Sequence, residues 1–198
     1  GFCRLLSLLK EKADELVARA ELSSAPTHFE ILTCLAFLYF AAQHVDIAVL
    51  EVGMGGKLDA TNVVTPLVSV ITTVSKDHQE FLGRTLSRIA REKAGIIKPG
   101  VPAVCGPSEG PAYKVIKKRA AKLPAPFLDV FGDKGALRTK KTGKGYQFFY
   151  FRDNKRFRYT PALPGKHQGR NAALAIVAAL ELSRRWKKLE QGKIVQGV

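Results

Sequence analysis

The chain has 198 residues, of which 46% are hydrophobic and 25% are charged. A chain of this length and apolar content can bury one substantial core, which excludes a mainly disordered protein and favours a single compact domain. The 32 lysines and arginines against 17 acidic residues give a net charge of +15, which favours anionic partners. The three cysteines lack metal-binding spacing and cannot all pair, so we expect neither a zinc site nor a disulfide framework, and a cytoplasmic location.

No segment has the pattern of a membrane span or a secretion signal. The longest apolar stretches, such as residues 35–42, are far shorter than the ~18 residues that a spanning helix needs. The N-terminus also lacks a cationic segment leading into an apolar one. We therefore expect no membrane association.

Two helices are predicted at the start of the chain. Residues 2–20 place apolar side chains three and four positions apart, as in an amphipathic helix. Thr27 and Glu30 have the spacing of a capping box, which opens a second, largely apolar helix to about Ala42. Because this second helix is apolar on all sides, we expect it to be buried.

Short β-branched runs then alternate with helical segments. Strands are predicted at 45–50, 67–74, 101–105 and 127–130, and helices at 85–94 and 111–122. This alternation predicts an α/β fold with a mostly parallel sheet flanked by helices. Further on, Asp153-Asn154 lies between two aromatic and basic runs and is a hairpin signal, so a small antiparallel β flap is expected before a last helix at 171–182.

Two polar residues follow buried strands of the predicted sheet. Glu51 ends the run 45–50, and His78 follows the run 67–74 after a short turn. Ligands collect at the carboxyl ends of parallel strands, and a carboxylate with a neutral imidazole can complete a site for a divalent cation. A carboxylate that caps backbone amides and a histidine with no special role are the alternatives.

The glycine-rich segments do not form a known phosphate-binding loop. The segment Gly53-Met54-Gly55-Gly56-Lys57 lacks the G-x-x-x-x-G-K-[ST] spacing, and Leu58 stands where the hydroxyl residue belongs. Lys93, near the end of a predicted helix, is explained by a favourable interaction with the helix dipole.

Several motifs occur together and in one order. They are Pro26-Thr27-His28-Phe29-Glu30, the run from Leu50 to Asn62, Asp77-His78 with Leu82-Gly83, Glu92-Lys93-Ala94-Gly95-Ile96-Ile97, and Gly165-Lys166-His167-Gln168 with Asn171-Ala172. In these motifs the chain resembles the folylpolyglutamate synthase/dihydrofolate synthase family of the Mur ligase superfamily. The resemblance covers most of residues 26–182. It implies an enzyme that uses ATP to phosphorylate the carboxylate of dihydropteroate or a folate, after which L-glutamate displaces phosphate to form an amide.

The resemblance also assigns the catalytic and metal-binding residues. Glu51 and His78 match the ligands of a Mg²⁺ ion that contacts the terminal phosphates of ATP. Lys93 matches a lysine that the family carries as a carbamate, and the modification replaces a cation that would repel Mg²⁺ with anionic oxygens. Lys76 departs from the family, where an apolar residue is more common.

Substrate-binding residues follow from the same motifs. Thr27, Phe29, Asp59 and Ala60 match positions that line the pterin pocket, where a ring can stack on the heterocycle and a carboxylate can accept its protons. Gln168 and Asn171 correspond to residues near the adenine of ATP.

The family also has segments that are absent from these 198 residues. They are a P-loop on the N-terminal side and a separate C-terminal domain, so residues 1–198 are interpreted as a partial central ATP-binding domain. Without the phosphate cradle, we expect the isolated chain to bind ATP weakly and to lack ligase turnover. We also expect it to be a monomer.

The sequence leaves two alternative functions open. A basic nucleic-acid-binding module is supported by the charge of +15 and by the basic and aromatic residues between 134 and 159, although a folate ligase is favoured over it. A Mur ligase that builds cell-wall peptides is the other alternative. Thr27, Phe29 and the run 58–62 fit the folate enzymes better.

Overall fold

The computed structural model describes residues 2–77, 79–132, 135–143, 145–186 and 188–197. The chain divides into two compact units. The first unit comprises residues 1–54 and 59–63, and the second comprises residues 55–58 and 64–198. The glycine-rich segment after residue 50 therefore contributes to both units.

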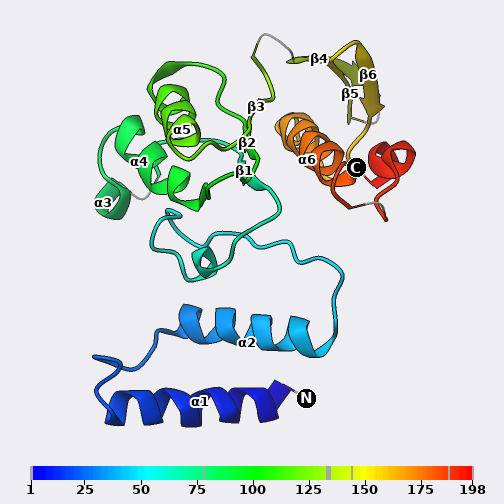
Figure 1. Ribbon diagram of the computed structural model, residues 1–198. Helices are drawn as coiled ribbons and strands as arrows, with labels where there is room; N and C mark the ends of the chain where they lie inside the picture. Colours follow the sequence, from blue (N-terminus) through cyan, green and yellow to red (C-terminus); the bar gives the residue numbers. More distant parts are fainter. Residues whose placement is uncertain (1, 78, 133–134, 144, 187, 198) are drawn as a thin grey trace. The chain divides into compact units, whose positions relative to one another are not determined.

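The first unit consists of two long helices and one short one. α1 (Phe2–Ala18) packs against α2 (His28–Ala42), and the 3₁₀ helix η1 (Ala60–Val63) contacts α2 (Figure 1). Both long helices and the capping box at Thr27 were predicted and are confirmed.

The prediction that α2 is buried was wrong. Only Thr33 and Leu35 of this helix are buried, whereas Leu38 and Tyr39 are exposed. In this unit α2 contacts α1 and η1. Two such neighbours cannot cover a helix that is apolar all round, so much of its apolar surface is exposed.

The strand predicted at 45–50 is also not formed. No described strand pairs with this segment, and the Val49 side chain is 94% exposed. β-branched residues favour an extended backbone, but a strand requires a neighbour to supply its hydrogen bonds. Without that neighbour the segment is an irregular connection.

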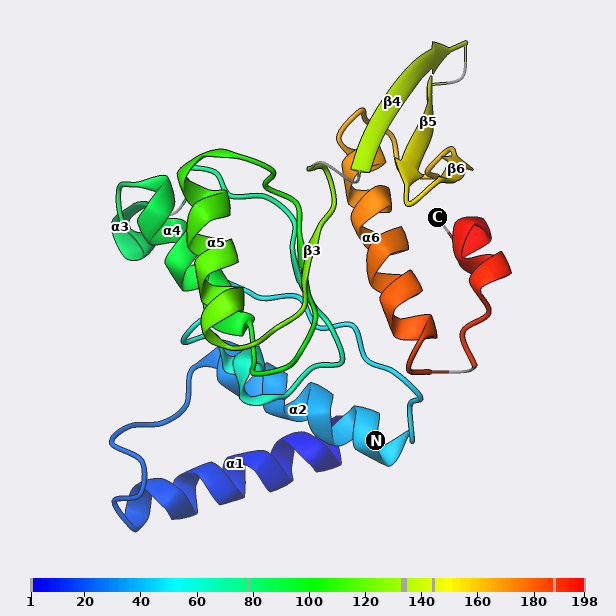
Figure 2. The same ribbon diagram turned by 45° about the horizontal axis from the view of Figure 1, so that its top comes forward.

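The second unit is built around a parallel sheet. Its strands β1 (Ser69–Ile71), β2 (Ala103–Cys105) and β3 (Phe127–Asp129) lie in the order β1-β2-β3, all parallel. The helices are α3 (Gln79–Leu82), α4 (Leu86–Lys93), α5 (Gly110–Lys122) and α6 (Gln168–Ser183), with 3₁₀ helices η2 (Ala94–Ile96) and η3 (Gln191–Gly197). α4 and α5 cover one face of the sheet and α6 the other (Figures 1 and 2).

Alternation along β2 explains the two layers. Val104 belongs to the core formed with α6, whereas Ala103 and Cys105 belong to the core formed with α4 and α5. All three side chains are almost fully buried, as expected for a central parallel strand covered on both faces. The predicted α/β fold with a mostly parallel sheet is confirmed.

The predicted antiparallel flap is present with three strands. β4 (Gly135–Thr142), β5 (Gly145–Arg152) and β6 (Lys155–Tyr159) form a separate sheet in that order. Asp153 and Asn154 have φ angles of 48° and 61°, which is the left-handed turn that their sequence predicts. The Tyr159 hydroxyl donates a hydrogen bond of 2.7 Å to the carbonyl of Gly169 and attaches the flap to α6.

Candidate functional site

Asp59 organises the glycine-rich loop of the first unit. One of its carboxylate oxygens accepts hydrogen bonds from the backbone N–H groups of Gly53 (3.0 Å) and Met54 (3.1 Å). The other accepts from the N–H (2.9 Å) and the hydroxyl (2.5 Å) of Thr61. The four donors use the lone pairs of both oxygens, so this carboxylate holds the loop closed.

These hydrogen bonds also decide the ionisation of Asp59. Partial burial is the largest single effect and raises the pKa of the carboxyl group. The hydrogen bonds from Thr61, Met54 and Gly53 together outweigh it, so the pKa lies below its usual value. The carboxylate is therefore ionised at neutral pH and available to its four donors.

Phe29 and Gly53 are in close contact within the same unit. A Cβ atom added to Gly53 would lie 2.7 Å from Cζ of the Phe29 ring, so only glycine lets the loop approach the ring this closely. Phe29 is 43% exposed, which leaves part of its surface free to contact another molecule. Thr27, the N-cap of α2, lies two residues away and donates from its hydroxyl to Glu30 at 2.7 Å. The structure thus brings Phe29 to the loop that Asp59 closes, with Thr27 at the start of the same helix and Ala60 directly after Asp59.

In the second unit, residues 55–58 lie against the end of α4. The Lys57 N–H donates a hydrogen bond of 2.9 Å to the Glu92 carbonyl. A Cβ atom on Gly95 would lie 2.4 Å from Cα of Lys57, and one on Gly56 would lie 2.9 Å from the Glu92 carbonyl oxygen. Glycine at both positions therefore allows the two backbones to touch.

Lys93 is the last residue of α4 and lies beside this contact. A Cβ atom on Gly56 would be 3.1 Å from the Lys93 carbonyl oxygen, which places the glycine turn next to the helix end. The Lys93 side chain is half-buried and has no hydrogen bond or ion pair with the described residues. A half-buried amine without an anionic partner is a suitable position for a modified lysine, which keeps that prediction open.

The predicted metal ligands are only partly described. Glu51 is exposed and makes no hydrogen bond or ion pair with the described residues. His78 lies outside the described residues. Within the described part of the chain, no group of three His, Cys, Asp or Glu side chains could hold a metal ion. Mg²⁺ commonly uses one or two protein carboxylates together with water and phosphate oxygens, so the Glu51 carboxylate is a chemically suitable donor.

The start of α6 carries the predicted adenine-binding residues. The Asn171 amide donates a hydrogen bond of 3.0 Å to the side-chain oxygen of Gln168. Asn171 is exposed and Gln168 is half-buried, so both retain polar groups for a ligand. Whether they bind adenine stays a prediction.

Sequence reasoning missed Arg170, which lies between these two residues. Its guanidinium donates a hydrogen bond of 3.1 Å to the Gly106 carbonyl and stacks 3.8 Å from the centre of the Phe131 ring. Gly106 follows β2, so Arg170 fixes the start of α6 at the carboxyl end of the parallel sheet. A lone arginine beside Gln168 gives no signal of such a distant partner.

The comparisons with known proteins identify the family. The Mur ligase middle domain matches residues 4–179, which is most of the chain. The chain belongs to the Mur ligase family. Among the described residues of the chain, no helix is both long and apolar enough to cross a membrane.

Relatives of known name are folate enzymes. The chain is 43% identical over 161 residues to a dihydrofolate synthase/folylpolyglutamate synthase of Bacillus subtilis, a match covering 80% of this chain and 37% of that protein. It is 42% identical over 154 residues to a folylpolyglutamate synthase of Lacticaseibacillus casei, covering 77% and 36%. The resemblance to the folylpolyglutamate synthase/dihydrofolate synthase family is thereby confirmed.

Solved structures agree over almost the whole chain. An FPGS–AMPPCP–folate complex has 35% identity and a TM-score of 0.86, and the match covers 98% of this chain and 48% of that one. The folylpolyglutamate synthase of Thermotoga maritima has 35% identity and a TM-score of 0.81, covering 98% and 43%. The chain thus spans about a third of the length of the two curated relatives and less than half of these solved chains.

Proposed function

We propose that this chain is part of an ATP-dependent ligase that joins L-glutamate to the carboxylate of dihydropteroate or a folate. The observation that carries the proposal is the match over 98% of the chain to a structure in complex with AMPPCP and folate. The unpaired state of all three cysteines fits a cytoplasmic enzyme.

The two units supply different parts of the proposed reaction. In the first unit, the exposed part of the Phe29 ring stacks on the pterin, and Thr27 and Ala60 line the same pocket. Asp59 keeps the loop under this ring closed, through the hydrogen bonds to Gly53 and Thr61. In the second unit, Gln168 and Asn171 hold the adenine of ATP with their paired amides.

Glu51, His78 and Lys93 are the residues that would hold Mg²⁺. A bound Mg²⁺ ion would neutralise the negative charge of the ATP phosphates. The Lys93 ammonium loses one proton to give the neutral amine, which can add CO₂ and release a second proton. The cation thereby becomes an anionic carbamate. The substrate carboxylate takes up the terminal phosphoryl group of ATP, and the glutamate amine then displaces phosphate from this acyl phosphate to form the amide.

A chimeric enzyme tests the proposal. The matching segment of the Bacillus subtilis relative would be replaced by residues 4–179 of this chain. We expect release of ADP that depends on both glutamate and dihydropteroate or a folate, and separate assays with each acceptor distinguish the two synthase activities. The nucleotide precursor of cell-wall peptides serves as the negative acceptor.

A point variant then tests the proposed site. In the chimera, Lys93→Met should abolish turnover, whereas Lys98→Met, five residues further on, should leave at least half of it. A chimera that folds and binds an ATP analogue, but hydrolyses no ATP with any folate acceptor, would contradict the proposal.

The isolated 198-residue polypeptide should behave differently. Its sequence contains no G-x-x-x-x-G-K-[ST] loop, so we propose that it binds ATP weakly and shows no turnover. We also propose that it is a monomer. Calorimetric titration with AMPPCP and a coupled ADP assay on this polypeptide check the statement. Glutamate-dependent ADP release from it would overturn the statement.

A further inference from the structure

The outward face of the antiparallel sheet carries charge that the proposed ligase reaction does not use. Directly opposite residues of antiparallel strands lie on one face of a sheet. The register places Arg138 opposite Phe149 and Phe149 opposite Arg158, so these three side chains form one row across the sheet. The next row contains Ala136, Phe151 and Arg156.

The other face of this sheet is the one that packs in the core. Phe148, Tyr150 and Tyr159 are buried there with residues of α6. Arg138, Lys140, Arg156 and Arg158 are exposed, which fixes their face as the outward one. We call the six side chains Arg138, Lys140, Phe149, Phe151, Arg156 and Arg158 the flap face.

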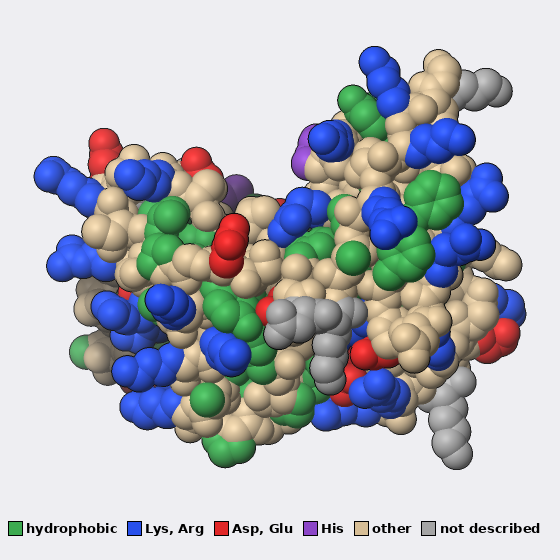
Figure 3. Space-filling model, turned by 90° about the horizontal axis from the view of Figure 1, so that it is seen from above, with side chains coloured by type: hydrophobic (Ala, Val, Ile, Leu, Met, Phe, Trp, Pro, Cys, Tyr) green, Lys and Arg blue, Asp and Glu red, His purple; other side chains and the backbone are tan. Residues whose placement is uncertain are grey.

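All charged side chains of the flap face are positive. The strands β4, β5 and β6 contain seven lysines and arginines and no acidic residue. None of the four cations of the flap face is in an ion pair with the described residues. On the right of Figure 3, Lys and Arg side chains surround hydrophobic ones. Unpaired cations at this density favour a ligand with repeated negative charge.

The two phenylalanines lie in the middle strand of the flap face. Both are partly exposed, although the opposite face of the same strand is the one that packs in the core. The Arg138 guanidinium lies 5.3 Å from the centre of the Phe151 ring. Rings between rows of cations can accept planar groups by stacking while the cations contact the charges that link those groups.

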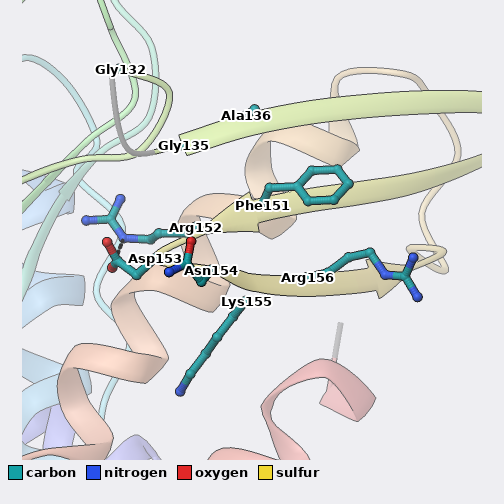
Figure 4. Close-up of a pocket in the computed structure, with 9 residues that line it drawn as sticks. All are labelled: Gly132, Gly135, Ala136, Phe151, Arg152, Asp153, Asn154, Lys155 and Arg156. Atoms are coloured by element: carbon teal, nitrogen blue, oxygen red, sulfur yellow. Dashed lines mark ion pairs between the residues drawn. The ribbon is translucent and has the colours of Figure 1, made fainter.

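A hollow extends the flap face at the turn between β5 and β6. It has a volume of about 940 Å³ and shares Ala136, Phe151 and Arg156 with the outward rows. Figure 4 shows the Phe151 ring and Arg156 on one side, with Arg152 and its ion-pair partner Asp153 (3.5 Å) at the turn. The cationic surface is therefore continuous with a hollow large enough for part of a ligand.

We propose that the flap face binds single-stranded nucleic acid without sequence preference. The cations contact the phosphates, and Phe149 and Phe151 stack with unpaired bases. A polycarboxylate such as poly-γ-glutamate would use the cations alone, and in duplex DNA the bases are already stacked. The combination of rings and cations therefore favours a single strand with exposed bases.

The first experiment measures the electrostatic part. Binding of a fluorescent oligo(dT) of twelve nucleotides is followed by anisotropy at several salt concentrations. The triple variant R138Q/K140Q/R158Q should weaken binding at least tenfold, and the slope of log K against log salt should fall by about 2. The matched variant K114Q/K118Q/K122Q removes three exposed lysines of α5 and the same total charge, and it should change the affinity less than threefold.

The second experiment measures stacking. An abasic strand of the same length carries the same phosphates, and the unaltered chain should bind it roughly tenfold more weakly than oligo(dT). The variants Phe149→Leu and Phe151→Leu should remove most of this difference while binding of the abasic strand persists. Circular dichroism and thermal melting of every variant show whether the flap is folded.

Three results would overturn the proposal. The first is equal weakening by the α5 variant, which would mean that only the net charge matters. The second is equal affinity for the abasic strand and oligo(dT). The third is tighter binding of poly-γ-glutamate than of oligo(dT) to the flap face, which would assign this face to a polycarboxylate. Because none of these assays uses ATP or folate, their outcome is independent of the proposed ligase activity.

Discussion

Asp59 shows how one side chain can hold a loop in shape. Its two oxygens accept four hydrogen bonds from Gly53, Met54 and Thr61, and Gly53 lies next to the Phe29 ring. We predict that Asp59→Asn destabilises this loop by about 1–3 kcal/mol, because an amide places N–H groups against other N–H groups. Amide hydrogen exchange at Gly53, Met54 and Thr61 is the measurement, and unchanged protection there would contradict the assigned role.

The same carboxylate predicts a dependence on pH. Its pKa is lowered in the folded chain, so its contribution to stability is complete above the unfolded value of about 4 and is lost as the pH falls through the lower folded value. Protection of the Gly53 amide should decrease on acidification in the unaltered chain and be independent of pH in Asp59→Asn over this range. Thr61→Val removes one donor only and should keep the pH dependence.

At the scale of elements, the backbone of residues 55–58 is in close contact with the end of α4. The approach of Lys57 to Gly95 leaves no room for a methyl group, since a Cβ atom would lie 2.4 Å from Cα of Lys57. We predict that Gly95→Ala lowers the free energy of unfolding of the second unit by about 1–3 kcal/mol and breaks the hydrogen bond from Lys57 to Glu92. Urea unfolding measures the change. Gly192→Ala, which has open space around its Cβ position, should cost less than about 0.5 kcal/mol.

The elements that the sequence predicted correctly are those with a local cause. The capping box at Thr27 and the hairpin at Asp153-Asn154 depend on residues a few positions apart, and both are found. The run 45–50 has the composition of a buried strand but needs a partner that a local pattern cannot supply. The prediction that α2 is buried was wrong for the same reason, since burial depends on what packs around a helix.

The same contrast holds for the candidate site: the motifs propose its residues, whereas the contacts that support them are seen only in the structure. The motifs propose Thr27, Phe29, Asp59, Lys93, Gln168 and Asn171 as site residues, and the structure places Phe29 against the loop that Asp59 closes. The four donors to Asp59 and the link from Arg170 to Gly106 were not predicted, because each depends on how the backbone turns or on contacts between residues far apart in the sequence. Local patterns therefore propose candidate residues of a site but do not predict the contacts that support them.

At the scale of the whole molecule, the two units differ in how much they bury. α1 has no buried residue and α2 has two, whereas α6 alone has seven. Local stability follows buried apolar contact, so we predict that amides of α1 and α2 exchange at least roughly 100-fold faster than those of β2 and α6. Hydrogen exchange with mass spectrometry measures this difference. Equal protection in both units would show that α1 and α2 are stabilised by contacts beyond those described.

The reactivity of the cysteine thiols tests whether the core of the second unit stays closed. Cys3 and Cys34 are exposed, whereas Cys105 of β2 is fully buried. Burial, followed by the negative charge of Asp129, raises the pKa of the Cys105 thiol to about 12, so almost no reactive thiolate forms at pH 8. We predict that a disulfide reagent modifies two thiols rapidly at pH 8 and the third only as the second unit unfolds.

The double variant C3S/C34S isolates that slow reaction. Its rate should rise with urea in parallel with unfolding of the parallel sheet, because Cys105 reacts only after α4 and α5 have left that face of β2. Cys105→Ser added to the double variant should abolish labelling and serves as the control. Rapid modification of Cys105 without denaturant would mean that the layer formed by α4 and α5 opens while the rest of the second unit is folded.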